Sequence, residues 1–132
     1  MNRLLCGVLL IIALFAIPTM ATESYFNYLN YRNLTAELKI LNSTFPDLVQ
    51  LGSLGQTLDK REVWMITLGA GVDSDKPALL IVAGVEAPEV ASTSILSRFI
   101  KTVAANYGQV DSVTQFLDRY SFYIVPRLNP DA

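Results

Sequence analysis

The spacing of apolar residues along the chain predicts three helices. The first begins after Asn30, where apolar residues recur every three or four positions along one helix face, at Leu34, Leu38, Leu41 and Phe45. Asn30 is suited to cap this helix, and Pro46 prevents it from continuing. A second stripe predicts a helix from Pro88 to about Asn106, facing inward at Leu96, Phe99, Ile100, Val103 and Tyr107. A short third helix is predicted over 110–119, facing inward at Val113, Phe116 and Leu117.

Four segments have the pattern of strands. Segments 48–54 and 62–68 are separated by a turn and are expected to pair as a hairpin. A third strand is predicted over 78–85, and its continuous apolar run is typical of a strand that is covered on both faces. A last strand over 121–125 is expected to lie parallel to the third, because the long helix makes a crossover between them. This order of elements predicts an α/β fold.

The first 21 residues have the layout of a secretory signal peptide. A short positive start precedes an apolar run over 4–18, and small residues offer a cleavage site after Ala21. The run is shorter than the stretch of about 20 residues that a transmembrane helix needs. We therefore expect a signal peptide over 1–21, one domain over 22–132, and a secreted or periplasmic protein. An uncleaved signal segment, which would hold the protein at a membrane, is the alternative.

Composition restricts the chemistry that the exported chain can perform. The sequence has no histidine, and its one cysteine, Cys6, lies in the signal segment. Disulfides and thiolate chemistry are therefore excluded, and metal or acid–base chemistry must use carboxylates. Basic residues are scattered, which argues against a nucleic-acid partner. Two matches to the N-glycosylation pattern, at Asn33 and Asn42, are most simply chance matches.

Two carboxylates mark a candidate site. Glu86 and Glu89 lie between the third strand and the long helix, and ligands of open α/β sheets gather at the carboxyl ends of strands. Pro88 suits the first position of the helix, which would place Glu89 in its first turn. There a carboxylate complements the helix dipole, so Glu89 also has a purely structural explanation. The pair without imidazole would favour calcium or magnesium over zinc.

Four motifs in order resemble those of the zinc carboxypeptidases related to carboxypeptidases A and B. Residues 45–49, Phe-Pro-Asp-Leu-Val, are similar to the family's "YPDLV" turn, and residues 54–64 are similar to its "IGKSxEGRxxW" hairpin. Residues 82–89 correspond to "xxGxHxxE". Residues 125–132 match "xPxxNPDG" except that Ala132 replaces glycine. The resemblance covers nearly all of the chain after the signal segment.

This resemblance implies an α/β/α sandwich on a mixed sheet and a zinc-dependent hydrolase that removes C-terminal residues from peptides or proteins. In the family, zinc is held by the histidine and glutamate of the third motif and by a second, distant histidine. Glu89 matches the glutamate ligand, Glu86 stands in place of the first histidine, and Pro88 stands where many members carry a functional arginine. The second histidine, the substrate-binding pair and the catalytic glutamate have no counterpart here, so no catalytic or substrate-binding residue is assigned.

Two hypotheses remain open at this point. The chain is either the N-terminal portion of an exported metallocarboxypeptidase with a degenerate metal site, or a non-catalytic relative that binds or scaffolds. A deacylase on the same scaffold is a weaker third hypothesis. Because the sequence stops in a proline-bounded turn after a strand, we expect the fold to be incomplete at its C-terminus. An incomplete sheet leaves an unpaired edge and uncovered apolar surface, so we also expect the chain to aggregate.

Overall fold

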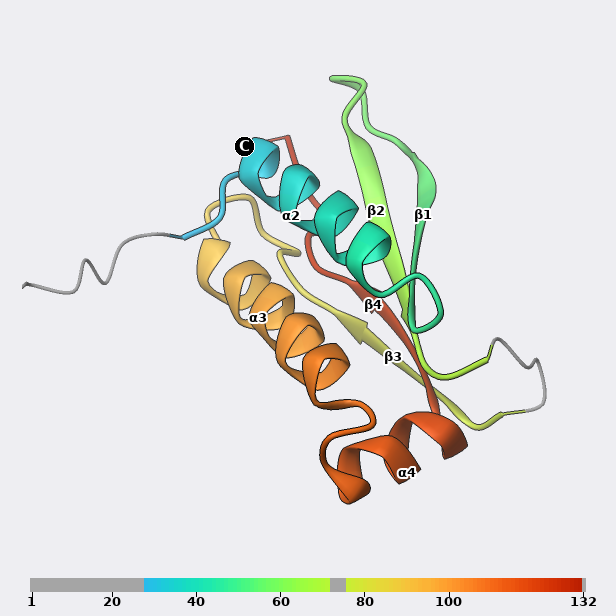
Figure 1. Ribbon diagram of the computed structural model, residues 1–132. Coiled ribbons are helices and arrows are strands. Elements are labelled where there is room, and N and C mark those ends of the chain that lie inside the picture. Colours follow the sequence, from blue (N-terminus) through green and yellow to red (C-terminus); the bar gives the residue numbers. More distant parts are fainter. Residues whose placement is uncertain (1–27, 72–75, 132) are drawn as a thin grey trace, which may run out of the picture.

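A computed structural model describes residues 28–71 and 76–131 of the chain (Figure 1). The described elements are, in order, α2 (Tyr31–Thr44), β1 (Val49–Gln56), β2 (Glu62–Leu68), β3 (Ala78–Val82), α3 (Val90–Asn106), α4 (Asp111–Arg119) and β4 (Ser121–Val125). The predicted helices and strands are all present, with bounds that differ by a few residues. The predicted signal peptide over 1–21 lies outside the described residues. Within the described ranges, no helix is both long and apolar enough to cross a membrane.

The four strands form one mixed sheet in the order β1–β2–β4–β3. β1 and β2 pair antiparallel, which confirms the predicted hairpin, and β2 also pairs antiparallel with β4, where Ile66 lies opposite Ile124. β3 and β4 are parallel, with Val82 opposite Val125. The crossover between them contains α3 and α4. The predicted α/β class and parallel pair are therefore confirmed.

Helices α2 and α3 lie along one face of this sheet, α4 lies at its end, and together they enclose the hydrophobic core (Figure 1). The side chain of Asn30 caps α2 as predicted, because its oxygen accepts a hydrogen bond of 2.9 Å from the N–H of Asn33. The predicted stripes of α2 and α3 both face this core. Its fully or nearly buried members are Leu34, Leu38, Leu41, Leu48, Val49, Ile66, Leu68, Ile100, Ala104, Leu117, Phe122 and Ile124.

The opposite face of the sheet is also apolar, because the alternation along each strand brings hydrophobic residues to both sides. A hollow of about 500 Å³ on this face is lined by Leu54, Met65, Leu80, Val82, Tyr123, Val125 and Leu128. β3 is an edge strand of the described sheet, and Leu79, Leu80 and Val82 are exposed. The expectation that the third strand is covered on both faces is therefore wrong for the described residues. The apolar run over 78–85 shows that β3 has hydrophobic side chains on both faces, but it does not show which segments cover them.

One helix differs from its predicted packing. The sequence predicts that Phe116 of α4 faces inward, yet this residue is 45% exposed, whereas the adjacent Leu117 is fully buried. The ring of Phe116 lies at the rim of the core, with its centroid 5.1 Å from that of Phe122 and 5.3 Å from that of Tyr120. The reason is that α4 is short and covers the end of the sheet rather than its middle (Figure 1).

Candidate functional site at the carboxyl ends of two parallel strands

The candidate site lies where β3 and β4 end side by side. β3 leads into residues 86–89, which we call the acidic turn, and β4 leads into residues 126–131, which we call the 126–131 loop. Two backbone hydrogen bonds of 2.9 Å join the 126–131 loop to the residues just before the acidic turn, from the N–H of Leu128 to the carbonyl oxygen of Ala83 and from the N–H of Asn129 to the carbonyl oxygen of Gly84. Glu86 and Glu89 therefore lie near the carboxyl ends of the parallel strands, where α/β proteins bind ligands.

Glu86 and Glu89 are both exposed on the acidic turn. The turn is closed by a hydrogen bond of 3.0 Å from the N–H of Glu89 to the carbonyl oxygen of Glu86, and one of 2.9 Å from Val90 to Pro88. The prediction that the helix starts at Pro88 is wrong by two residues, because these bonds form a turn ahead of α3. Glu89 instead occupies the N-cap position, where its side chain makes no capping hydrogen bond. Its exposed carboxylate can therefore meet a ligand.

A buried arginine, Arg127, binds the backbone of the acidic turn. Arg127 is only 5% exposed, although removing a guanidinium from water is costly. Its Nη2 donates a hydrogen bond of 3.0 Å to the carbonyl oxygen of Ala87, and its Nε donates one of 3.3 Å to that of Asn129. Both described acceptors are main-chain oxygens rather than carboxylates. The sequence pattern does not single out Arg127, because arginine is mostly exposed in folded proteins and nothing local to it indicates burial.

Gly84 makes room for this arginine. The residue has a φ of 57°, and a Cβ placed there would lie 2.9 Å from Cγ of Arg127 and 3.1 Å from Oγ1 of Thr93. Glycine is therefore required both by the left-handed conformation and by the close approach of the two segments. The hydroxyl of Thr93 is buried, and within the described part of the chain it has no hydrogen-bond partner.

The hairpin holds the other side of the 126–131 loop. The guanidinium of Arg61 donates to the carbonyl oxygen of Pro130, and the hydroxyl of Thr57 donates a hydrogen bond of 2.6 Å to Oδ1 of Asp131. Arg61 also lies over the ring of Tyr31, with Cζ 5.8 Å from the ring centroid. Asp131 thus contacts a residue that is distant in sequence.

The side chains of the described residues do not by themselves fit a zinc ion. No group of three or more histidine, cysteine, aspartate and glutamate side chains is placed to hold a metal within residues 28–71 and 76–131. Glu86 and Glu89 supply two carboxylates, and the whole sequence contains no histidine. Catalytic zinc sites use three protein ligands and structural sites four. The acidic turn alone is therefore an incomplete site for zinc.

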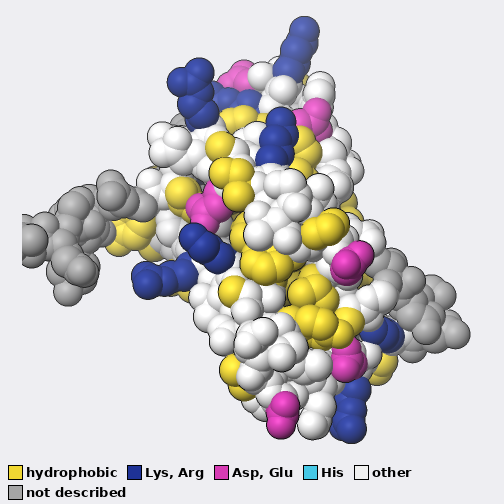
Figure 2. All heavy atoms as spheres, viewed as in Figure 1, with side chains coloured by type: hydrophobic (Ala, Val, Ile, Leu, Met, Phe, Trp, Pro, Cys, Tyr) yellow, Lys and Arg dark blue, Asp and Glu magenta, His cyan; other side chains and the backbone are white. Residues whose placement is uncertain are grey.

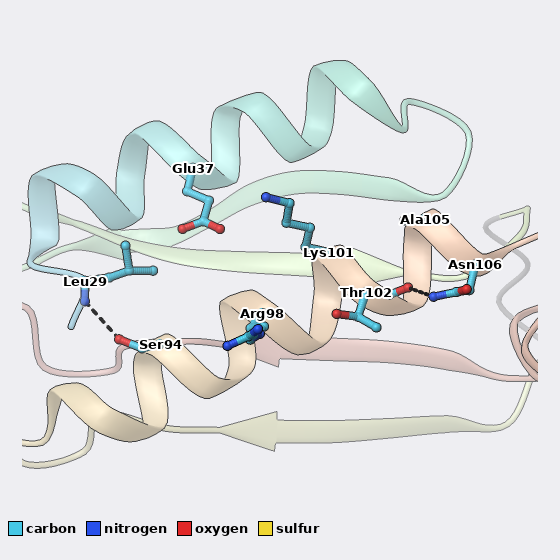
Figure 3. A pocket seen from close by; sticks show the side chains of 8 residues that line it. All are labelled: Leu29, Glu37, Ser94, Arg98, Lys101, Thr102, Ala105 and Asn106. Atoms are coloured by element: carbon cyan, nitrogen blue, oxygen red, sulfur yellow. Dashed lines mark hydrogen bonds between the residues drawn. The ribbon is translucent and has the colours of Figure 1, made fainter. Parts of the chain in front are cut away.

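A second concave feature lies between α2 and α3 on the helical face (Figure 3). This groove of about 630 Å³ is lined by Leu29, Glu37, Ser94, Arg98, Lys101, Thr102, Ala105 and Asn106. The hydroxyl of Ser94 already bonds to the N–H of Leu29 and the carbonyl oxygen of Val90. The same face carries interspersed positive and negative side chains rather than one basic patch (Figure 2). The groove therefore presents charge of both signs, while the paired acids lie elsewhere.

The family model described as zinc carboxypeptidase matches residues 34–131. Carboxypeptidase D of Anas platyrhynchos is 30% identical over 111 residues, which cover 82% of this chain and 8% of that protein. Carboxypeptidase B of Bos taurus is 30% identical over 109 residues, covering 83% of this chain and 26% of that protein. The zinc carboxypeptidase of Saccharothrix mutabilis subsp. capreolus is 28% identical, covering 89% and 28%. The chain therefore spans less than a third of the length of these relatives.

Solved structures show the same fold. The chain superimposes on thrombin activatable fibrinolysis inhibitor with a TM-score of 0.73 and 24% identity, covering 79% of this chain and 26% of that one. A metallo-carboxypeptidase from Burkholderia cenocepacia gives a TM-score of 0.67 and 24% identity, covering 77% and 27%. The mixed sheet and its helices are thus those of a carboxypeptidase fold.

Proposed function

Because the chain belongs to the zinc carboxypeptidase family, we propose that it forms the N-terminal part of the catalytic domain of an exported metallocarboxypeptidase-like protein. In the complete protein, the reaction would be hydrolysis of the last peptide bond of a peptide or protein. The substrate class is the free C-terminus of a polypeptide. Zinc would polarise the scissile carbonyl and activate water.

We further propose that the metal site is degenerate and that this chain alone does not hydrolyse peptides. The observation that carries this proposal is the donor set of the acidic turn. Glu89 stands at the position of the family's glutamate ligand, while Glu86 replaces the histidine. Two carboxylates and no imidazole favour oxygen-preferring ions over zinc, and they leave a bound ion less positive and a weaker Lewis acid.

The second candidate is a non-catalytic relative that binds polypeptide C-termini or acts as a scaffold. Its support is also Glu86, because a protein that no longer performs the reaction has no need of the histidine. The two candidates differ in the complete protein, where only the first removes a C-terminal residue. A peptide assay with a free-carboxylate substrate and the same peptide with an amidated C-terminus separates them.

The metal site is tested by equilibrium dialysis of the full chain against zinc. We expect the wild-type chain to retain less than stoichiometric zinc. E86H restores one imidazole three residues before Glu89 and should raise zinc affinity measurably, whereas E86Q, the matched control, should not. The double variant E86H/E89Q should lose the gain. Stoichiometric zinc on the wild-type chain, or an E86H variant that binds like E86Q, would contradict the proposed degenerate site.

A further inference from the structure

The 126–131 loop is held from two sides by side chains that come from different parts of the chain. On one side, Arg61 and Thr57 of the hairpin bind Pro130 and Asp131. On the other side, Arg127 extends from the loop to Ala87 in the acidic turn. The loop is therefore a connection between the hairpin and the residues that carry Glu86 and Glu89.

The bond from Arg127 is the side-chain link from the loop to the centre of the acidic turn. The turn's own hydrogen bonds, Glu89 to Glu86 and Val90 to Pro88, are local, so they set its shape without tying it to the sheet. The two backbone bonds from the loop reach Ala83 and Gly84, which precede the turn. Among these described contacts, only the hydrogen bond from the guanidinium of Arg127 reaches a residue between the two glutamates, namely Ala87.

The burial of Arg127 supports such an anchoring role. Removing a guanidinium from water is unfavourable unless its donors are satisfied, and hydrogen bonds from a charged donor are stronger than those between neutral groups. Gly84 keeps the path of the side chain open, because a Cβ there would lie 2.9 Å from Cγ of Arg127 and 3.0 Å from its Cα. The absence of a side chain at Gly84 thus allows the guanidinium of Arg127 to reach the carbonyl oxygen of Ala87.

We infer that Arg127 is a positioning residue, which fixes the acidic turn against the 126–131 loop and thereby sets where Glu86 and Glu89 are presented. This inference rests on the proposed function in one respect, which is that the acidic turn is taken as the metal site. The orientation of both carboxylates then depends on a residue that is distant in sequence, since Arg127 and its partner Ala87 are 40 positions apart. Loss of the guanidinium should release the turn while leaving the core intact.

Amide hydrogen exchange of the full chain tests the inference without requiring zinc or activity. In R127M, the amides of Glu89 and Val90 should exchange at least about tenfold faster, because a charged hydrogen bond holding the turn is lost. The amides of Ile66 and Ile124 in the core should stay within about twofold of wild type. R119M, which changes an exposed arginine of α4, is the matched control and should leave the turn unchanged.

R127K keeps the charge and most of the stem but lacks the planar guanidinium, so it should give partial protection of the turn. This milder variant also serves if R127M does not fold. Unchanged exchange at Glu89 and Val90 in R127K and R127M would overturn the inference. Equal acceleration of the turn and of the core amides would also overturn it, because Arg127 would then contribute to global stability rather than to positioning. Because the exchange measurement needs no zinc, its result can be interpreted even if the chain does not bind zinc.

Discussion

At the scale of single residues, the site depends on two glutamates that the sequence identifies and on an arginine and a glycine whose roles only the fold shows. Glu86 and Glu89 are recognisable from the sequence because they lie between an apolar strand and a helix, where ligands of α/β sheets gather. Arg127 is not recognisable in this way, since its role depends on Ala87, which only the fold brings near. Gly84 is required for the same reason, because its Cβ would meet Arg127.

We predict that G84A lowers the free energy of unfolding by about 2–4 kcal/mol, through left-handed backbone strain plus overpacking against Arg127. Gly108 offers a matched control, because it has a φ of 73° and a Cβ placed there would meet nothing within 4 Å. G108A should cost only the backbone term of about 1 kcal/mol. Urea unfolding at neutral pH measures both values. Equal losses in the two variants would show that the contact with Arg127 adds nothing.

At the scale of elements, the hairpin was predictable and its detailed register was not. The sequence predicts strands over 48–54 and 62–68, but the pairing of β1 with β2 is irregular between Ser53 and Gln56. At this irregularity, the side chains of Gln56 and Ser53 donate hydrogen bonds to the carboxylate of Glu62. These bonds, that from Gln56 first, lower the pKa of Glu62 below its ordinary value.

This lowered pKa predicts a dependence of stability on acidity. Because the folded state binds the Glu62 proton more weakly than the unfolded state, the stabilisation is present above the ordinary carboxyl pKa. It is lost as the pH falls through the lowered pKa of the folded state. E62Q should therefore show a smaller loss of unfolding free energy than wild type between about pH 7 and about pH 3. Q56A should also reduce the loss, and an unchanged profile in both variants would contradict the assignment.

At the scale of the whole molecule, the described sheet has one covered face and one uncovered apolar face. The helices enclose the core on the first, while Leu54, Met65, Leu80 and Tyr123 line a hollow on the second. Apolar patches of this kind favour association with other surfaces. The expected aggregation of the chain thus has a defined location.

We predict that L80K reduces self-association of the full chain, measured as the concentration dependence of light scattering. Leu80 is 64% exposed on the edge strand, so a lysine there interrupts the apolar face and the open edge together. L58K is the matched control, because Leu58 is 100% exposed at the hairpin turn and lies outside that face. Neither change should alter the free energy of unfolding by more than about 0.5 kcal/mol. If L58K reduces association as much as L80K, general charge explains the effect.

The sequence by itself determined the helices, the strands and the family, because apolar periodicity and short ordered motifs are local properties of the chain. It also located Glu86 and Glu89, since their place between a strand and a helix follows from neighbouring residues. The exposure of β3 and the role of Arg127 were decided by the tertiary structure. Each depends on contacts between segments far apart in sequence, which no local pattern of side chains contains.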